Sequence, residues 1–151
     1  MMQLTEYFKE NMIHLDFQAG DKDEALNKMV KILESAGNVD DVVGMRTALI
    51  DREKLGTTGV GGGIAIPHAR CAAAKELSVG FFRSKEGVNF QAIDNQPVHL
   101  VFLLLAPVAS GGAYLKLLAK ISRLLRSDEF RNSLLEAKTP GEVMEIIREN
   151  D

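Results

Sequence analysis

The chain carries, at residues 98–105, the run Val98-His99-Leu100-Val101-Phe102-Leu103-Leu104-Leu105. Apart from its histidine the run is apolar, and it lacks the alternation of polar and apolar residues that marks a strand with one solvent-exposed face. Such a pattern is typical of a strand that is covered on both sides. Prolines at positions 97 and 107 bracket the run, and proline is tolerated at the ends of strands rather than inside them. The run therefore predicts the central strand of a layered α/β protein.

Other segments of the chain predict strands and helices that pack around this central strand. Residues 11–17 alternate in polarity, residues 64–66 form a short apolar run and residues 77–83 are largely apolar, so each predicts a strand. Apolar spacing and capping residues predict helices over 21–36, 40–54, 114–125, 127–135 and 139–148. Because helices do not separate the strands regularly, we expect a mixed β-sheet sandwiched between helices. At 151 residues, the chain is expected to form one domain over 1–151.

A glycine-rich segment before the strand at 64–66 is the strongest functional signal. It runs Gly56-Thr57-Thr58-Gly59-Val60-Gly61-Gly62-Gly63 and leads through the strand to Pro67 and His68. Glycines let backbone N–H groups turn toward an anion, and a neutral imidazole is a nucleophile near pH 7. The segment therefore indicates chemistry at His68 on a group the size of a phosphate.

A phosphoryl-accepting histidine needs one ring nitrogen with a free lone pair and the other held by a hydrogen bond. Phosphorylation adds roughly two negative charges, and an arginine fork suits phosphate oxygens. Arg52, at the end of the helix before the glycines, and Arg70, which we expect to face solvent, are the candidates. The backbone amides of Gly59, Gly61, Gly62 and Gly63 are expected to surround the phosphoryl group.

The same residues also fit a tight surface turn beside an inert histidine. The glycines match neither the P-loop pattern, because no Gly-Lys-Ser/Thr follows, nor the dinucleotide fingerprint. The separations of His14, His68 and His99 lack the short paired spacing of a zinc site, and Cys71 adds only one soft ligand, so we expect no metal. His99 is expected to be a hydrogen-bonded structural residue of the central strand, and His14 to lie away from the chemistry.

Composition narrows the remaining classes of function. A formal net charge of -3 gives no basic excess for nucleic-acid binding. The longest apolar stretch is too short to cross a membrane, which takes about 20 residues, and residues 1–6 lack the pattern of a secretory signal. One cysteine fits a reducing compartment. We therefore expect a cytoplasmic protein that neither inserts into a membrane nor binds nucleic acid.

The segment REKLGTTGVGGGIAIPHAR, residues 52–70, resembles the active-site signature of enzyme IIA components of the bacterial phosphotransferase system. The resemblance is to the mannitol/fructose type, which includes nitrogen-regulatory members, and it extends over nearly the whole chain. It implies a mixed sheet between helices and a phosphohistidine carrier without a cofactor. His68 would take a phosphoryl group from the histidine-containing phosphocarrier protein and pass it to a cysteine of enzyme IIB for sugar uptake. Arg52 would help to hold the group.

One position departs from the family pattern. Many members have a second histidine near the phosphorylated one, where this chain has Tyr114. A tyrosine hydroxyl can donate a hydrogen bond to a phosphoryl oxygen, but it brings no positive charge. The sequence shows no attached IIB or IIC segment, which favours a free-standing subunit. The alternative hypothesis is therefore a regulatory IIA protein that controls a kinase, channel or transcription factor through its phosphorylation state.

Overall fold

The computed structural model describes residues 3–151, and its central strand lies where the apolar run predicts it. This strand, β6, covers Val98–Ala106 and pairs in antiparallel fashion with β5, Ser78–Val88. On its other side β6 pairs in parallel with two short strands, β3 (Ile64–Ala65) and β4 (His68–Arg70). β6 is therefore an interior strand, and the chain on both sides of Pro67 is anchored to it.

The sheet is mixed, as the sequence predicts. Its strand order is β1-β5-β6-β3-β2, with β4 beside β6. β1 covers Ile13–His14 and runs parallel to β5, whereas β2 covers Gly59–Gly61 and forms a hairpin with β3. The strand predicted over 11–17 is thus only two residues long. Glu10–Met12 forms the 3-10 helix η2 instead, because the amides of Met12 and Ile13 bond to carbonyls three residues back.

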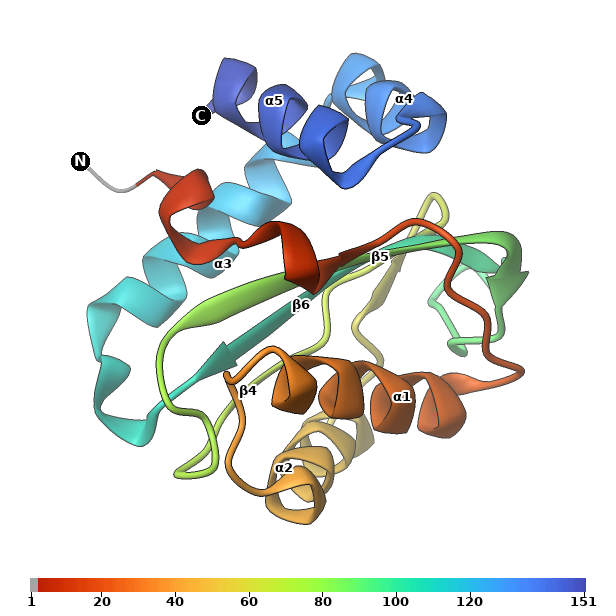
Figure 1. Ribbon diagram of the computed structural model, residues 1–151. Coiled ribbons are helices and arrows are strands. Elements are labelled where there is room, and N and C mark those ends of the chain that lie inside the picture. Colours follow the sequence, from red (N-terminus) through yellow and green to blue (C-terminus); the bar gives the residue numbers. More distant parts are fainter. Residues whose placement is uncertain (1–2) are drawn as a thin grey trace.

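Helices cover both faces of the sheet (Figure 1). α1 (Lys22–Ser35) and α2 (Val42–Lys54) pack on one face. The other face carries the 3-10 helix η1 (Leu4–Tyr7), α3 (Gly112–Leu124), α4 (Asp128–Glu136) and α5 (Pro140–Asn150). A 3-10 turn, η3 (Val108–Ser110), connects β6 to α3. The result is the predicted sandwich of one mixed sheet between two helical layers.

Side chains of the two central strands alternate between two apolar cores. Phe82, Val101 and Leu103 belong to the core beneath α1 and α2, whereas Phe81 and Phe102 belong to the core beneath α3, α4 and α5. All five are at least 98% buried. The double coverage explains why the run at 98–105 is apolar without alternation.

Three helix starts lie at the predicted capping residues. The side chains of Asp21, Ser127 and Thr139 each accept a hydrogen bond from an amide in the first turn of α1, α4 and α5. Asp41 does the same for α2, one residue later than predicted. No helix within residues 3–151 is long and apolar enough to span a bilayer.

Candidate functional site

His68 is the first residue of β4, which pairs with the interior strand β6. It is paired with Leu104 of β6, and the Leu104 amide donates to the carbonyl of Pro67 at 2.9 Å. Pro67 fixes its own backbone angle, and it separates β3 from β4 without removing either from β6. The backbone that carries His68 is therefore fixed by the central strand, while its side chain is half-buried.

The hydrogen bonds of the His68 ring determine its tautomer. Nδ1 lies 2.7 Å from the Ile66 carbonyl oxygen, which can only accept, so Nδ1 carries the proton. Nε2 lies 3.3 Å from Nε of Arg52, which can only donate, so Nε2 presents its lone pair. The ring is thus a neutral imidazole whose nucleophilic nitrogen faces a guanidinium.

The surroundings of His68 also favour the neutral ring. Burial lowers the pKa of His68 below its ordinary value of 6.5; the Ile66 carbonyl acts in the opposite direction, and the positive charge of Arg52 adds to the lowering. Glu53 raises the pKa by its negative charge. The balance leaves the lone pair available at neutral pH, as a nucleophile requires.

We expect NMR titration of the ring to give a His68 pKa below 6.5. Replacing Arg52 with glutamine should raise this pKa, but not above the ordinary value, because burial is the larger cause. Since the unfolded chain then binds the proton more tightly, the unfolding free energy should fall as the pH drops through 6.5. A His68 pKa above the ordinary value would contradict this description of the site.

Arg52 and Tyr114 lie beside the ring from two helices, and Arg70 stacks on Tyr114. Arg52 lies in the last turn of α2, and its Nη1 donates to the Gly56 carbonyl at 2.9 Å. The ring of Tyr114, near the start of α3, lies 6.1 Å from the His68 ring, centroid to centroid. The Arg70 guanidinium lies 5.0 Å from the centre of the Tyr114 ring. Arg70 is exposed as predicted, yet it stacks on a residue of the site.

Tyr114 is 6% exposed and lies in the field of two cations. Burial raises the pKa of its hydroxyl, and Arg70 and Arg52 both lower it by a smaller amount. The hydroxyl therefore stays protonated at neutral pH and can donate a hydrogen bond.

The structure does not bring the glycine turn together with His68. The Gly63 carbonyl accepts the amides of His99 and Leu100, whereas His68 is opposite Leu104. Four residues along a strand correspond to about 13 Å. The Gly62 amide is already bonded to Asp94 at 3.0 Å. Gly59 and Gly61 belong to β2, which pairs with β3 rather than with the histidine strand.

Gly59 and Gly62 have different structural roles. A Cβ on Gly59 would lie 2.8 Å from both the Cα and the Cβ of Ala92, so another side chain does not fit there. Gly62 has a φ of 66° and open space around it, so only its backbone angle calls for glycine. These glycines form the hairpin between β2 and β3.

Two alanine variants test this assignment. Gly59→Ala should lower the unfolding free energy by about 2–3 kcal/mol, because Ala92 must move with its backbone. Gly62→Ala should cost about 1 kcal/mol, for the strained φ alone. Chemical denaturation measures both.

The other two histidines lie elsewhere. Nδ1 of His99 donates a hydrogen bond to the Ser84 carbonyl at 2.8 Å, which is the structural role predicted for this histidine. His14 stacks on Phe82, with 5.6 Å between ring centres, on the β1 edge. Among residues 3–151, no group of three or more His, Cys, Asp or Glu side chains is placed to hold a metal ion.

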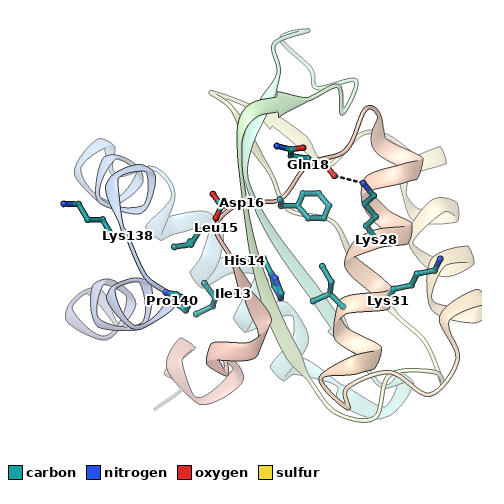
Figure 2. A pocket seen from close by; sticks show the side chains of 11 residues that line it. Ile13, His14, Leu15, Asp16, Gln18, Lys28, Lys31, Lys138 and Pro140 are labelled. Carbon is teal, nitrogen blue, oxygen red and sulfur yellow. Dashed lines mark hydrogen bonds between the residues drawn. The ribbon is translucent and has the colours of Figure 1, made fainter.

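A hollow of about 650 Å³ opens at the β1 edge of the sheet, with β5 and β6 between it and the histidine strand. Figure 2 shows its wall of α1, where Lys28 reaches the Gln18 carbonyl at 2.9 Å. Lys138 and Pro140 line the opposite side. None of the residues around His68 lines this hollow.

Sequence reasoning missed two charged residues beside the site. Glu53 follows Arg52 in α2, and its side chain is 5% exposed, in an ion pair with Lys22 of α1. Glu53 stands in the quoted signature, but nothing in the local pattern marks it as buried. Its burial depends on a lysine from a different helix, which only the fold brings near.

Fold and site together define a class of α/β protein in which a mixed sheet presents one neutral imidazole to a guanidinium from a neighbouring helix. Residues 6–150 match the family model described as "Phosphoenolpyruvate-dependent sugar phosphotransferase system, EIIA 2". The chain therefore belongs to the EIIA 2 family of that system.

Curated relatives carry sugar-specific names. The chain is 36% identical, over 99% of its length, to the fructose-specific EIIABC component of Bacillus subtilis, of which it spans only 24%. It is 38% identical to the fructose-specific EIIA component of Haloferax volcanii, with 91% of this chain and 90% of that protein covered.

Solved structures share the fold. The nitrogen regulatory protein IIA-Ntr of Neisseria meningitidis superposes with a TM-score of 0.87 at 34% identity, covering 95% of this chain and 97% of that one. The mannitol enzyme IIA of Escherichia coli, solved in complex with phosphorylated enzyme IIB, gives a TM-score of 0.79 at 23% identity, covering 94% and 97%.

Proposed function

We propose that this protein is a phosphohistidine carrier that accepts a phosphoryl group on Nε2 of His68. The donor is the phosphohistidine of the histidine-containing phosphocarrier protein, and the acceptor is a cysteine of an enzyme IIB. The observation that supports this best is the tautomer of His68, which places a lone pair on Nε2 beside the Arg52 guanidinium. The relay needs no metal or organic cofactor, and it would operate in the cytoplasm.

The transfer balances without another reactant. The Nε2 lone pair forms a bond to phosphorus while the P–N bond of the donor breaks, and the electrons of that bond stay on the donor imidazole. The proton on Nδ1 remains hydrogen-bonded to the Ile66 carbonyl, so the ring keeps its orientation. In the next step a thiolate sulfur of IIB bonds to phosphorus, and the Nε2–P bond breaks to return the lone pair to His68.

Arg52 and Tyr114 would hold the transferred group. A phosphoryl group on Nε2 takes the place of the present contact between Nε2 and Arg52, so the guanidinium fork is free to donate to the phosphoryl oxygens. The Tyr114 hydroxyl, protonated at neutral pH, supplies a further donor from α3.

The choice of acceptor rests on similarity. The mannitol enzyme IIA of E. coli, which shares this fold, was solved with phosphorylated IIB, and two relatives bear fructose-specific names. We therefore infer that a sugar-specific IIB domain accepts the phosphoryl group from His68 and passes it on for sugar uptake.

Incubation with phosphoenolpyruvate, enzyme I and the phosphocarrier protein tests the proposal. We expect one phosphoryl label per chain that is labile in acid and stable in alkali, as a phosphoramidate on imidazole is. Omitting the phosphocarrier should prevent labelling. A label that survives acid, or no label with all components present, would contradict the proposal.

A regulatory role is the second candidate, because the IIA-Ntr protein of N. meningitidis matches with a TM-score of 0.87. In that role the phosphorylation state controls another protein, such as a kinase, channel or transcription factor. Discharge separates the two candidates. A transport subunit loses its label to a fructose-type IIB within the assay, whereas a regulator loads normally and keeps its label with every IIB offered.

Removing the Tyr114 hydroxyl tests its role. Tyr114→Phe keeps the ring against His68 and should slow phosphoryl uptake by about tenfold, the effect of losing one hydrogen bond of about 1.4 kcal/mol to a charged group. Tyr114→His, which offers an imidazole, should be at least as fast as the parent protein. Rapid-quench labelling measures both rates. Equal rates for Tyr114→Phe and the parent would remove the hydroxyl from the mechanism.

A further inference from the structure

A buried ion pair joins α1 to Glu53, the residue next to Arg52 in α2. Nζ of Lys22, the first residue of α1, is 3.0 Å from a carboxylate oxygen of Glu53 in α2. The two side chains are 11% and 5% exposed. Desolvation makes a buried ion pair a poor source of net stability compared with apolar residues of the same volume. Its position beside Arg52 therefore suggests a role in the site rather than in the core.

The carboxylate of Glu53 holds the segment that follows α2. It accepts the Thr58 amide at 2.9 Å and the Thr58 hydroxyl at 2.5 Å. Between Glu53 and Thr58 lies Gly56, whose carbonyl accepts the Arg52 guanidinium. The carboxylate thus links Glu53 to Thr58 across the short segment whose Gly56 carbonyl binds Arg52.

Lys22 holds the same segment from the other side. Its Nζ donates to the Thr57 hydroxyl at 3.2 Å, and that hydroxyl donates to the Phe90 carbonyl. Nζ also lies 5.3 Å from the centre of the Phe90 ring. One ammonium group therefore connects α1, the segment after α2 and the segment after β5.

The ion pair of Lys22 and Glu53 also affects the net charge around a phosphoryl group on His68. The charged and titratable groups facing His68 are Arg52 and Glu53 from α2 and Tyr114 from α3, with Arg70 of β4 stacked on Tyr114. Glu53 is the negative one among them. A phosphoryl group adds roughly two more negative charges, which an unbalanced buried carboxylate would repel.

We propose that Lys22 is a positioning residue for phosphoryl transfer: it neutralises Glu53 and fixes the segment that orients Arg52. This inference rests on the proposed function of His68. The polar partners of Lys22 are Glu53 and Thr57 rather than the imidazole or Arg52, so Lys22 acts through those two residues.

NMR titration of His68 in the unphosphorylated protein tests the charge balance independently of any transfer. Lys22→Met should raise the pKa of His68, because Glu53 then acts without its counter-ion. Glu53→Gln should lower it. The double variant, with neither charge, should return the pKa close to the parent value. A pKa of His68 that is the same in Lys22→Met and the parent protein would overturn the proposal.

Phosphoryl uptake provides the second readout. Lys22→Met should take up label about tenfold more slowly, because the remaining partner is a buried, uncompensated charge. Lys22→Arg and the double variant Lys22→Met/Glu53→Gln should recover most of the rate. Lys28→Met is the matched control, since Lys28 forms an exposed ion pair with Glu24 on the same helix; its rate should be that of the parent.

Amide spectra establish that each variant is folded before it is assayed. An uptake rate for Lys22→Met within twofold of Lys28→Met would overturn the proposal. A double variant as slow as Lys22→Met would also overturn it, because the effect would then not be one of charge balance. If the parent protein itself takes up no label, the proposed function fails, while the titration of His68 still decides whether Lys22 balances Glu53.

Discussion

Replacing His68 with alanine is expected to abolish phosphoryl labelling of this protein. His68 is the histidine whose Nε2 presents a lone pair to a guanidinium, and alanine supplies no nucleophilic atom at that position. The label in His68→Ala should therefore fall to the background seen without the phosphocarrier protein. Measuring the incorporated phosphate under identical loading conditions checks this.

The remaining histidines provide the controls. His14→Ala removes a ring that stacks on Phe82 at the β1 edge, and His99→Gln changes a ring that bonds to the Ser84 carbonyl. Both variants should label fully once they are shown to be folded. An undiminished label in His68→Ala, or a loss confined to His99→Gln, would place the phosphorylated nitrogen elsewhere.

Replacing Arg52 with alanine should have the second-largest effect. A preorganised donor to a group that gains charge in the transition state contributes about 10²–10³ in rate, so Arg52→Ala should slow uptake by about that factor. The loss should appear in the rate constant at saturating phosphocarrier, because Arg52 acts on the transferred group. Rapid-quench labelling over a range of phosphocarrier concentrations separates this from weaker docking.

Arg52→Lys separates charge from geometry. Lysine keeps the positive charge but loses the planar fork that reaches Nε2 and the Gly56 carbonyl together. We expect a rate between those of Arg52→Ala and the parent protein. Arg126, an exposed arginine after α3, is the matched control, and Arg126→Ala should leave uptake unchanged. If Arg52→Ala and Arg126→Ala have equal rates, Arg52 has no part in the transfer.

The layered fold could be predicted where a local sequence pattern fits only one kind of structural element. The run at 98–105 predicts a doubly covered strand, and β6 is that strand. Asp21, Ser127 and Thr139 predict helix starts, because few other arrangements use a side-chain oxygen followed by an apolar stripe. Alternation over 11–17 was a weaker signal: η2 takes the first two residues of that segment, and only Ile13–His14 form a strand.

The parts of the site that could be predicted are those that the signature and the family resemblance name, which include Tyr114 of α3 beside His68. The signature indicates His68 and Arg52, and their side chains lie within hydrogen-bonding distance. The glycines of the β2–β3 hairpin are nearer to His68 in sequence than Arg52 is. Their turn nevertheless lies beside Leu100 of β6 and away from Leu104, which pairs with His68. The stacking of Arg70 on Tyr114 and the pairing of Lys22 with Glu53 depend on distant elements, so no local pattern reveals them.

The anchoring of Pro67 to Leu104 has a mechanical consequence. Because the backbone that carries His68 is held to β6, a phosphoryl donor and a phosphoryl acceptor would each have to bring their reactive atom to Nε2. Deuterium exchange at the Leu104 amide reports on that immobility, and this proton should remain among the slowest to exchange in both the loaded and the empty state.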